Sequence, residues 1–218
     1  PAACSAIEVL AKHFSGSHPD QFLPVLSTVV GLIEKHHVAF KDNNEVVVSE
    51  DEHMRVLIDC SFLSSAALCN GLGTRAFPVV QQLVPLVLDR LHQLNSQQGK
   101  RVKTKTEEER DQESLMAALA TLAAVAEHLS RFLHPFLERI LSITHSGACL
   151  SATTSMITNA PATGALSLIS QLHTSIASGV PLRLAVPIFA KIFDRLKHDA
   201  EDNGDGGNHA HMSLLRVF

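Results

Sequence analysis

Apolar side chains recur every three to four residues in eight blocks of this 218-residue chain, and hydrophilic stretches separate the blocks. Such a period places the apolar residues on one face of a helix. No block sustains the period-two alternation of a half-buried strand. We therefore predict an all-α protein. The predicted helices cover residues 3–14, 22–34, 53–73, 78–94, 113–129, 133–143, 164–178 and 182–197.

The eight predicted helices form four pairs, each joined by a short turn and separated from the next by a longer polar stretch. The second helices resemble one another, and they begin about 50 to 60 residues apart, slightly more than the ~40–47 residues of HEAT and armadillo repeats. Their sequences are "FLPVLSTVVGLI", "VVQQLVPLVLDRL", "FLHPFLERILSI" and "LRLAVPIFAKIFDRL".

Burial explains why such a pair is repeated. Two amphipathic helices cannot cover both of their apolar faces alone, so each pair stacks on the next. We predict an α-solenoid of about four HEAT-like helical hairpins with long polar inter-repeat loops, forming a single array over residues 1–218. The predicted repeats are 1–40, 52–94, 113–145 and 162–198, and residues 212–218 begin a further repeat. We also expect this sequence to be a segment of a longer chain.

Each second helix carries a proline, at Pro24, Pro85, Pro135 and Pro187. A proline in the first helical turn lacks only an N–H that would be unpaired anyway, and Pro135 is predicted to mark such a start. Pro85 and Pro187 lie deeper in their helices and are expected to bend them.

The solenoid prediction specifies burial. We expect eight side chains to be buried: Leu83, Leu86, Leu119, Leu122, Leu137, Ile140, Leu168 and Ile192. We expect exposed, mobile loops at residues 41–50, 95–111 and 198–209.

Composition narrows the function classes. The chain has ten Phe but no Trp or Tyr, which argues against a β-sandwich or an aromatic recognition surface, and its net charge of −4 gives no overall basic footprint for nucleic acid. The four cysteines form no C-x-x-C pair, so we expect buried or idle thiols. No uninterrupted apolar run approaches the ~20 residues of a membrane span.

Candidate chemistry is sparse. The sequence holds neither G-x-S-x-G nor a phosphate-binding P-loop, and "CNGLG" closes a predicted helix, where a glycine serves as a C-cap. His209 and His211 follow an acidic, glycine-rich stretch that fits an EF-hand loop poorly and is favoured as a solvated linker. We predict no catalytic, cofactor or metal site and no small-molecule substrate.

Basic residues cluster once, at Lys100, Arg101, Lys103 and Lys105. They could contact RNA phosphates or an acidic partner, but "EEERD" follows directly, and a solvated linker is the favoured interpretation. Separately, Arg75, Arg131 and Arg183 recur in the predicted inter-helix turns, where they can cap helix carbonyls.

Several segments carry a family resemblance. These are "SAALCNGLGTRAFPVVQQLVPLVLDRL", "LSRFLHPFLERIL" and "SGVPLRLAVPIFAKIF". Together they resemble the C-terminal half of the HEAT repeat-containing protein 1 family, the large HEAT-repeat subunits of the small-subunit processome. The match covers most of residues 60–196.

The resemblance implies a non-enzymatic scaffold of the nucleus and nucleolus. It implies roles in pre-rRNA processing, maturation of 18S rRNA and support of ribosomal DNA transcription. The implied partners are protein subunits of a large ribonucleoprotein assembly, with pre-rRNA or snoRNA contacted directly or indirectly, and no membrane. It transfers no functional residues.

Two other interpretations remain open. One is a HEAT-repeat interaction scaffold of another kind, such as a transport receptor or a kinase or phosphatase scaffold. The other is a helical enzyme, for which the sequence lacks a convergent set of acid, base and nucleophile.

Overall fold

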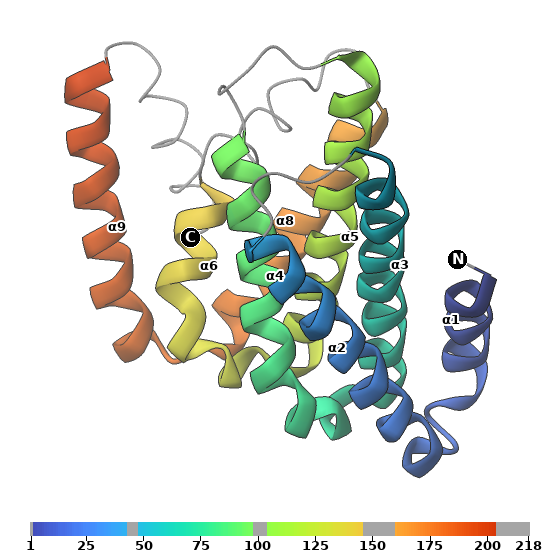
Figure 1. The fold of residues 1–218 in the computed structure, drawn as a ribbon. Helices are drawn as coiled ribbons and strands as arrows, with labels where there is room; N and C mark the ends of the chain where they lie inside the picture. The colour runs from blue at the N-terminus through green and yellow to red at the C-terminus, as the bar shows by residue number, and fades with distance from the viewer. Residues whose placement is uncertain (1, 43–47, 98–103, 146–159, 204–218) are drawn as a thin grey trace.

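The computed structural model describes residues 2–42, 48–97, 104–145 and 160–203, and the regular elements in these ranges are α-helices and short 3-10 helices (Figure 1). The first helices of the four pairs are α1 (Ala2–Phe14), α3 (Val48–Leu72), α5 (Lys105–Leu129) and α8 (Ala160–Gly179). The second helices are α2 (Pro19–Asp42), α4 (Phe77–Gln97), α6 (Leu137–Thr144) and α9 (Leu182–Asn203). The 3-10 helices are η1 (Gly73–Ala76), η2 (Ser130–Phe132) and η3 (His134–Phe136).

The helices form two layers that run from α1 at one end to α9 at the other (Figure 1). In one layer α1 packs on α3, α3 on α5 and α5 on α8; in the other α2 packs on α4, α4 on α6 and α6 on α9. Each helix thus contacts the next helix of its own layer in a linear stack, which confirms the predicted all-α solenoid.

The two layers are staggered. Helix α2 packs extensively on α3, the first helix of the following pair, and α4 packs likewise on α5. A second helix therefore covers the apolar face of the first helix of the next unit. The core is continuous from Ala11 to Ile192.

The predicted loops are too long. Helix α2 extends to Asp42 and α3 begins at Val48, so much of 41–50 is helical; α4 continues to Gln97 and α9 to Asn203. The helices thus also reach beyond the predicted repeat boundaries. The apolar period fades in these polar helix ends, although their backbone remains helical. Residues 43–47, 98–103 and 204–209 lie outside the described ranges.

Helix α5 begins at Lys105, eight residues before the predicted start at 113, because a capping box fixes its N-terminus. The Thr104 side chain accepts a hydrogen bond from the Glu107 backbone N–H at 3.3 Å, and the Thr104 N–H donates to Glu107 Oε2 at 2.9 Å. These reciprocal bonds satisfy two otherwise unpaired donors. The charged segment predicted as a loop is therefore the first part of a helix.

Six of the eight side chains predicted to be buried are so: Leu83, Leu119, Leu122, Leu137, Ile140 and Ile192. Leu86 and Leu168 are only partly buried, although both pack against the core. Leu86 lies at the edge of the buried stripe on α4 that contains Leu83 and Val87. Leu168 lies at the surface, where α8 approaches α3 and α5.

Gly73 and Pro135 lie at helix boundaries close to those predicted, and the bending predicted at Pro85 and Pro187 stays a prediction. Gly73 has a φ of +57° directly after α3, the left-handed conformation that favours glycine. Pro135 lies at the start of the 3-10 helix η3, and α6 begins only at Leu137. Pro24, Pro85 and Pro187 lie inside α2, α4 and α9.

Two described stretches, Glu52–Ser96 and Lys105–Phe132, are long and apolar enough on average to cross a membrane, although neither is an uninterrupted apolar run. They contain most of α3 and α4 and all of α5, the central helices of the stack. In their most apolar windows 50% and 61% is buried inside the protein, as a core helix requires.

Successive units pack closely against each other at two glycines, Gly71 and Gly179. A Cβ added at Gly71 of α3 would lie 2.9 Å from Ser15 Cβ and 3.0 Å from the Ala11 carbonyl oxygen. A Cβ at Gly179 of α8 would lie 2.5 Å from Ser130 Cβ and 3.3 Å from the Arg131 N. At each junction the end of a first helix contacts the turn of the preceding unit.

We expect Gly179→Ala to lower the free energy of unfolding by about 1–3 kcal/mol, because the added methyl overpacks this junction. The matched control is Gly31→Ala on α2, where a Cβ would meet nothing within 4 Å. That change should raise stability by about 0.5–1 kcal/mol, since alanine is the better helix former. Urea denaturation measures both; equal effects of the two substitutions would contradict the close approach.

Candidate functional site

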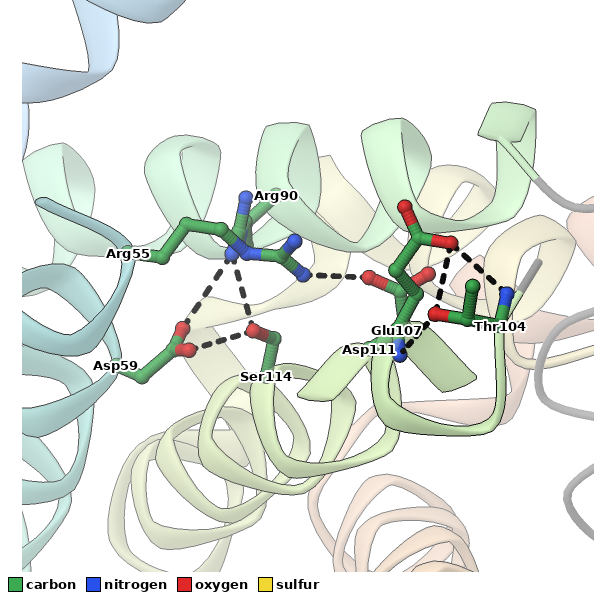
Figure 2. Close-up of polar contacts among 7 residues, drawn as sticks. All are labelled: Arg55, Asp59, Arg90, Thr104, Glu107, Asp111 and Ser114. Carbon is green, nitrogen blue, oxygen red and sulfur yellow. Dashed lines mark hydrogen bonds and ion pairs between the residues drawn. The ribbon is translucent and has the colours of Figure 1, made fainter. Parts of the chain in front are cut away.

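A buried polar cluster joins three helices at the centre of the stack (Figure 2). Arg90 of α4 donates from Nη2 to Ser114 Oγ of α5 at 3.0 Å, and Ser114 Oγ donates to Asp59 Oδ2 of α3 at 2.5 Å. Arg90 Nη2 also lies 3.5 Å from Asp59 Oδ1. Arg90 is only 6% exposed. Burial lowers the pKa of Arg90 and the Asp59 carboxylate acts in the opposite direction.

Two further ion pairs flank this cluster on the same helices. Arg55 Nη2 of α3 donates to Asp111 Oδ1 of α5 at 2.5 Å (Figure 2), and Arg110 Nη2 lies 2.6 Å from Glu52 Oε1. The arrangement is a structural clasp that fixes the register of α3, α4 and α5. Because each cation is held by a carboxylate, we assign the clasp no chemical role.

We expect Arg90→Met to destabilise the chain by about 3–5 kcal/mol, because it leaves the partly buried Asp59 without its cation. Arg139→Met is the control, since Arg139 pairs with Asp89 at a more exposed position. Its loss should cost less than about 1 kcal/mol. Adding Asp59→Leu to Arg90→Met should recover part of the stability, and strictly additive effects would argue against the pairing.

A second buried polar group lies between α6 and α8. The rings of His145 and His173 stack with centroids 5.2 Å apart, and Thr144 Oγ1 lies 3.2 Å from His173 Nε2. His145 Nδ1 donates to the Leu141 carbonyl at 2.8 Å. Burial lowers the pKa of His145, and burial together with His145 lowers the pKa of His173 to about 3. Both rings are therefore held neutral at physiological pH.

These depressed values link stability to pH. A histidine that is neutral when folded but free to protonate when unfolded contributes its full stability above the ordinary pKa of 6.5 and loses it as pH falls toward the folded value of about 3. We expect unfolding free energy to fall by about 1–2 kcal/mol from pH 7 to pH 5 through His173. In His173→Leu that fall should be smaller by this amount in denaturant titrations; an unchanged slope would contradict it.

Two of the described cysteines, Cys60 and Cys69, are poor nucleophiles. Burial raises the pKa of Cys69 to about 12, and burial followed by the neighbouring Cys4 raises that of Cys60. Both thiols are therefore protonated at neutral pH. Within the described ranges no group of three or more His, Cys, Asp or Glu side chains could hold a metal ion. His209, His211 and Cys149 lie outside those ranges.

The structure locates only one residue of the predicted basic cluster. Lys105 is the first residue of α5, its side chain is 90% exposed, and its Nζ lies 3.9 Å from Glu109 Oε1. Lys100, Arg101 and Lys103 lie outside the described residues. Their role in RNA or acidic-partner contact stays a prediction.

The inter-helix turns form one edge of the stack, at the bottom of Figure 1. Arg75 in η1, Arg131 in η2 and Arg183 in the first turn of α9 lie along this turn edge, all exposed. None makes a hydrogen bond or ion pair within the described part of the chain, so the predicted carbonyl capping is wrong. The edge is a row of cations available to a partner.

An exposed aromatic pair lies on the same edge. The Phe77 and Phe132 ring centroids are 4.4 Å apart, and the two side chains are 36% and 42% exposed. They line a shallow pocket of about 400 Å³ with Thr74, His128 and Arg131. Helical periodicity alone could not separate these exposed Phe side chains from core positions.

A larger groove opens on the face formed by α3, α5 and α8, with a volume of about 660 Å³. Sequence reasoning missed it because its apolar residues look like core residues. The available signal was a second apolar stripe on α3, at Val56, Cys60 and Leu63, in addition to the buried stripe that contains Phe62.

Comparison with known proteins supports the predicted family. HEAT repeat-containing protein 1 of Danio rerio is 24% identical over 202 residues, or 92% of this chain, and that of Homo sapiens is 26% identical over 196 residues, or 89%. The chain resembles a segment of HEAT repeat-containing protein 1. It spans 8% of the length of either relative. No family model and no solved structure matches it.

The match to HEAT repeat-containing protein 1 confirms the resemblance that the turn and proline motifs suggested. It covers about nine tenths of the chain, more than the residues 60–196 that contain those motifs. The chain thus has the architecture of a HEAT-repeat scaffold, and the candidate site is a set of recognition surfaces: the turn edge and the groove.

Proposed function

We propose that this chain is a non-enzymatic scaffold segment of a nucleolar ribosome-biogenesis factor. It acts within the small-subunit processome in pre-rRNA processing, maturation of 18S rRNA and support of ribosomal DNA transcription. The observation that carries the proposal is similarity to HEAT repeat-containing protein 1 over about nine tenths of the chain, at 24% and 26% identity.

The surfaces of the stack support a scaffold role. A linear array presents a long face on each layer and two edges, so several partners can bind side by side without competing for one pocket. The acidic balance of the chain, −4 overall, favours protein subunits as the main partners.

Direct RNA contact is proposed for basic side chains only. Arg75, Arg131 and Arg183 on the turn edge are exposed and free of carboxylate partners among the described residues, which suits phosphate groups. The exposed Phe77–Phe132 pair could stack a base beside Arg131. Lys100, Arg101, Lys103 and Lys105 are the second candidate contact.

Co-purification of the tagged full-length protein tests the proposal. We expect it to recover small-subunit processome proteins and pre-rRNA, and we expect the protein subunits to persist after ribonuclease treatment because protein contacts dominate. Recovery of transport cargo or of a kinase or phosphatase in their place would favour another HEAT scaffold and overturn the proposal.

A charge-reversal series separates the RNA contact from the assembly. Arg75→Glu, Arg131→Glu and Arg183→Glu together should reduce RNA crosslinking about tenfold, because phosphate contacts act through charge. Lys35→Glu is the control, an exposed reversal in the second half of α2, away from the turns. Equal crosslinking in both variants would remove the turn edge from the proposal.

A further inference from the structure

The groove between α3 and α5, closed at one side by Leu168 of α8, has the dimensions of a binding site. Its volume of about 660 Å³ falls in the ~300–1,000 Å³ range of ligand pockets. The α5 side of the lining extends from Glu109 to Ala120, which at 1.5 Å per residue is about 16 Å, or three helical turns. Such a length suits a short helix better than a compact metabolite.

The floor of the groove is apolar and partly open to solvent. Val56 is 44% exposed and Leu63 is 40% exposed, and both project from α3. Met116 and Ala120 of α5 and Leu168 of α8 are half-buried in the same lining. Val56, Cys60 and Leu63 follow the i, i+4, i+7 spacing by which one helix presents anchors to another. A methionine in the floor lets it adapt to the partner's shape.

The charges of the groove are all of one sign. Its lining contains Asp59, Glu109 and Glu113 and no basic side chain among the described residues. Asp59 is held by the clasp and Glu109 pairs weakly with Lys105. Glu113 is exposed and makes no ion pair or hydrogen bond within the described part of the chain. The apolar floor and the carboxylates towards the N-terminal end of α5 are complementary to a partner that has apolar anchor residues and basic residues at one end.

We propose that this groove docks an amphipathic helix of a partner protein, with its leucine-like anchors on Val56, Leu63, Met116 and Leu168 and its lysines or arginines beside Glu109 and Glu113. This adds a contact surface to the proposed scaffold function and names the kind of partner that it takes. The docking proposal does not depend on which assembly contains the chain. A negative result with the peptide would therefore overturn the docking proposal alone, whereas a negative co-purification would overturn the proposed function.

Fluorescence anisotropy with the full chain tests the docking. The probe is a fluorescein-labelled peptide of about 12 residues, with leucines at i, i+3, i+4 and i+7 and lysines elsewhere. Two control peptides have the same length: one has glutamates for lysines, and one has the same composition in an order that breaks the apolar face. We expect saturable binding of the probe and at least about tenfold weaker binding of either control.

Paired variants locate the contact. Glu113→Lys should weaken probe binding about tenfold and improve binding of the glutamate peptide. Glu34→Lys, a charge reversal at another exposed position on α2, should change the binding of either peptide by less than about twofold. Leu63→Lys should weaken the probe about tenfold, and Leu32→Lys on α2, at 38% exposure, should not. Circular dichroism confirms folding, and Glu113→Lys, an exposed change, keeps the test available if Leu63→Lys unfolds.

Three outcomes overturn the proposal. One is the absence of saturable binding by the unaltered chain. Another is equal weakening by the groove variants and their α2 controls. A third is a concentration-dependent dimer in analytical ultracentrifugation that Leu63→Lys dissociates while the peptide does not bind, because the occupant would then be a second copy of the chain.

Discussion

The whole structure depends on apolar surface that no single helical hairpin can cover. In α3 and α5, for example, buried side chains occur on more than one face of each helix, so each needs neighbours on several sides. The sides are supplied by the preceding first helix, the following first helix and a second helix. Since hydrophobic burial is the main favourable term in folding, this need for several neighbours selects the linear two-layer stack.

Polar groups make that stack specific. Apolar side chains alone would allow α4 to shift along α3 and α5 at a modest cost in free energy. Arg90 prevents such a shift, because it contacts both Ser114 and Asp59 in one register only. The His145–His173 pair acts similarly between α6 and α8, since Thr144 and the Leu141 carbonyl accommodate the rings in one arrangement. Such clusters contribute little net stability, and their value lies in the register that they define.

Much of this fold could be predicted from the sequence, because the spacing of apolar residues and the Gly and Pro residues at helix ends are local features that the sequence shows directly. Gly73 marked the end of α3 and Pro135 marked the 3-10 turn that precedes α6, and Leu119 and Leu137 were recognised as core. The start of α5 was missed although Thr104 and Glu107 have the spacing of a capping box, because the charged residues after them have no apolar stripe.

The clasp could not be predicted from the sequence. Asp59 and Ser114 lie on different helices, and they come into contact only because of how the helices stack. The groove was missed for a related reason, since whether Leu63 faces the core or solvent is decided by how α5 and α8 sit beside α3.

The stagger of the layers has a mechanical consequence. Helix α2 lies on α3 and α4 lies on α5, so each of these second helices packs mainly on the unit that follows its own. Force applied along the array cannot detach one hairpin without exposing the apolar face of the next, so neighbouring hairpins must yield together. The stack therefore responds to small loads as an elastic beam that bends and recoils, and it gives way at larger loads in cooperative blocks. A stack of this kind can change its curvature while its helices keep their contacts.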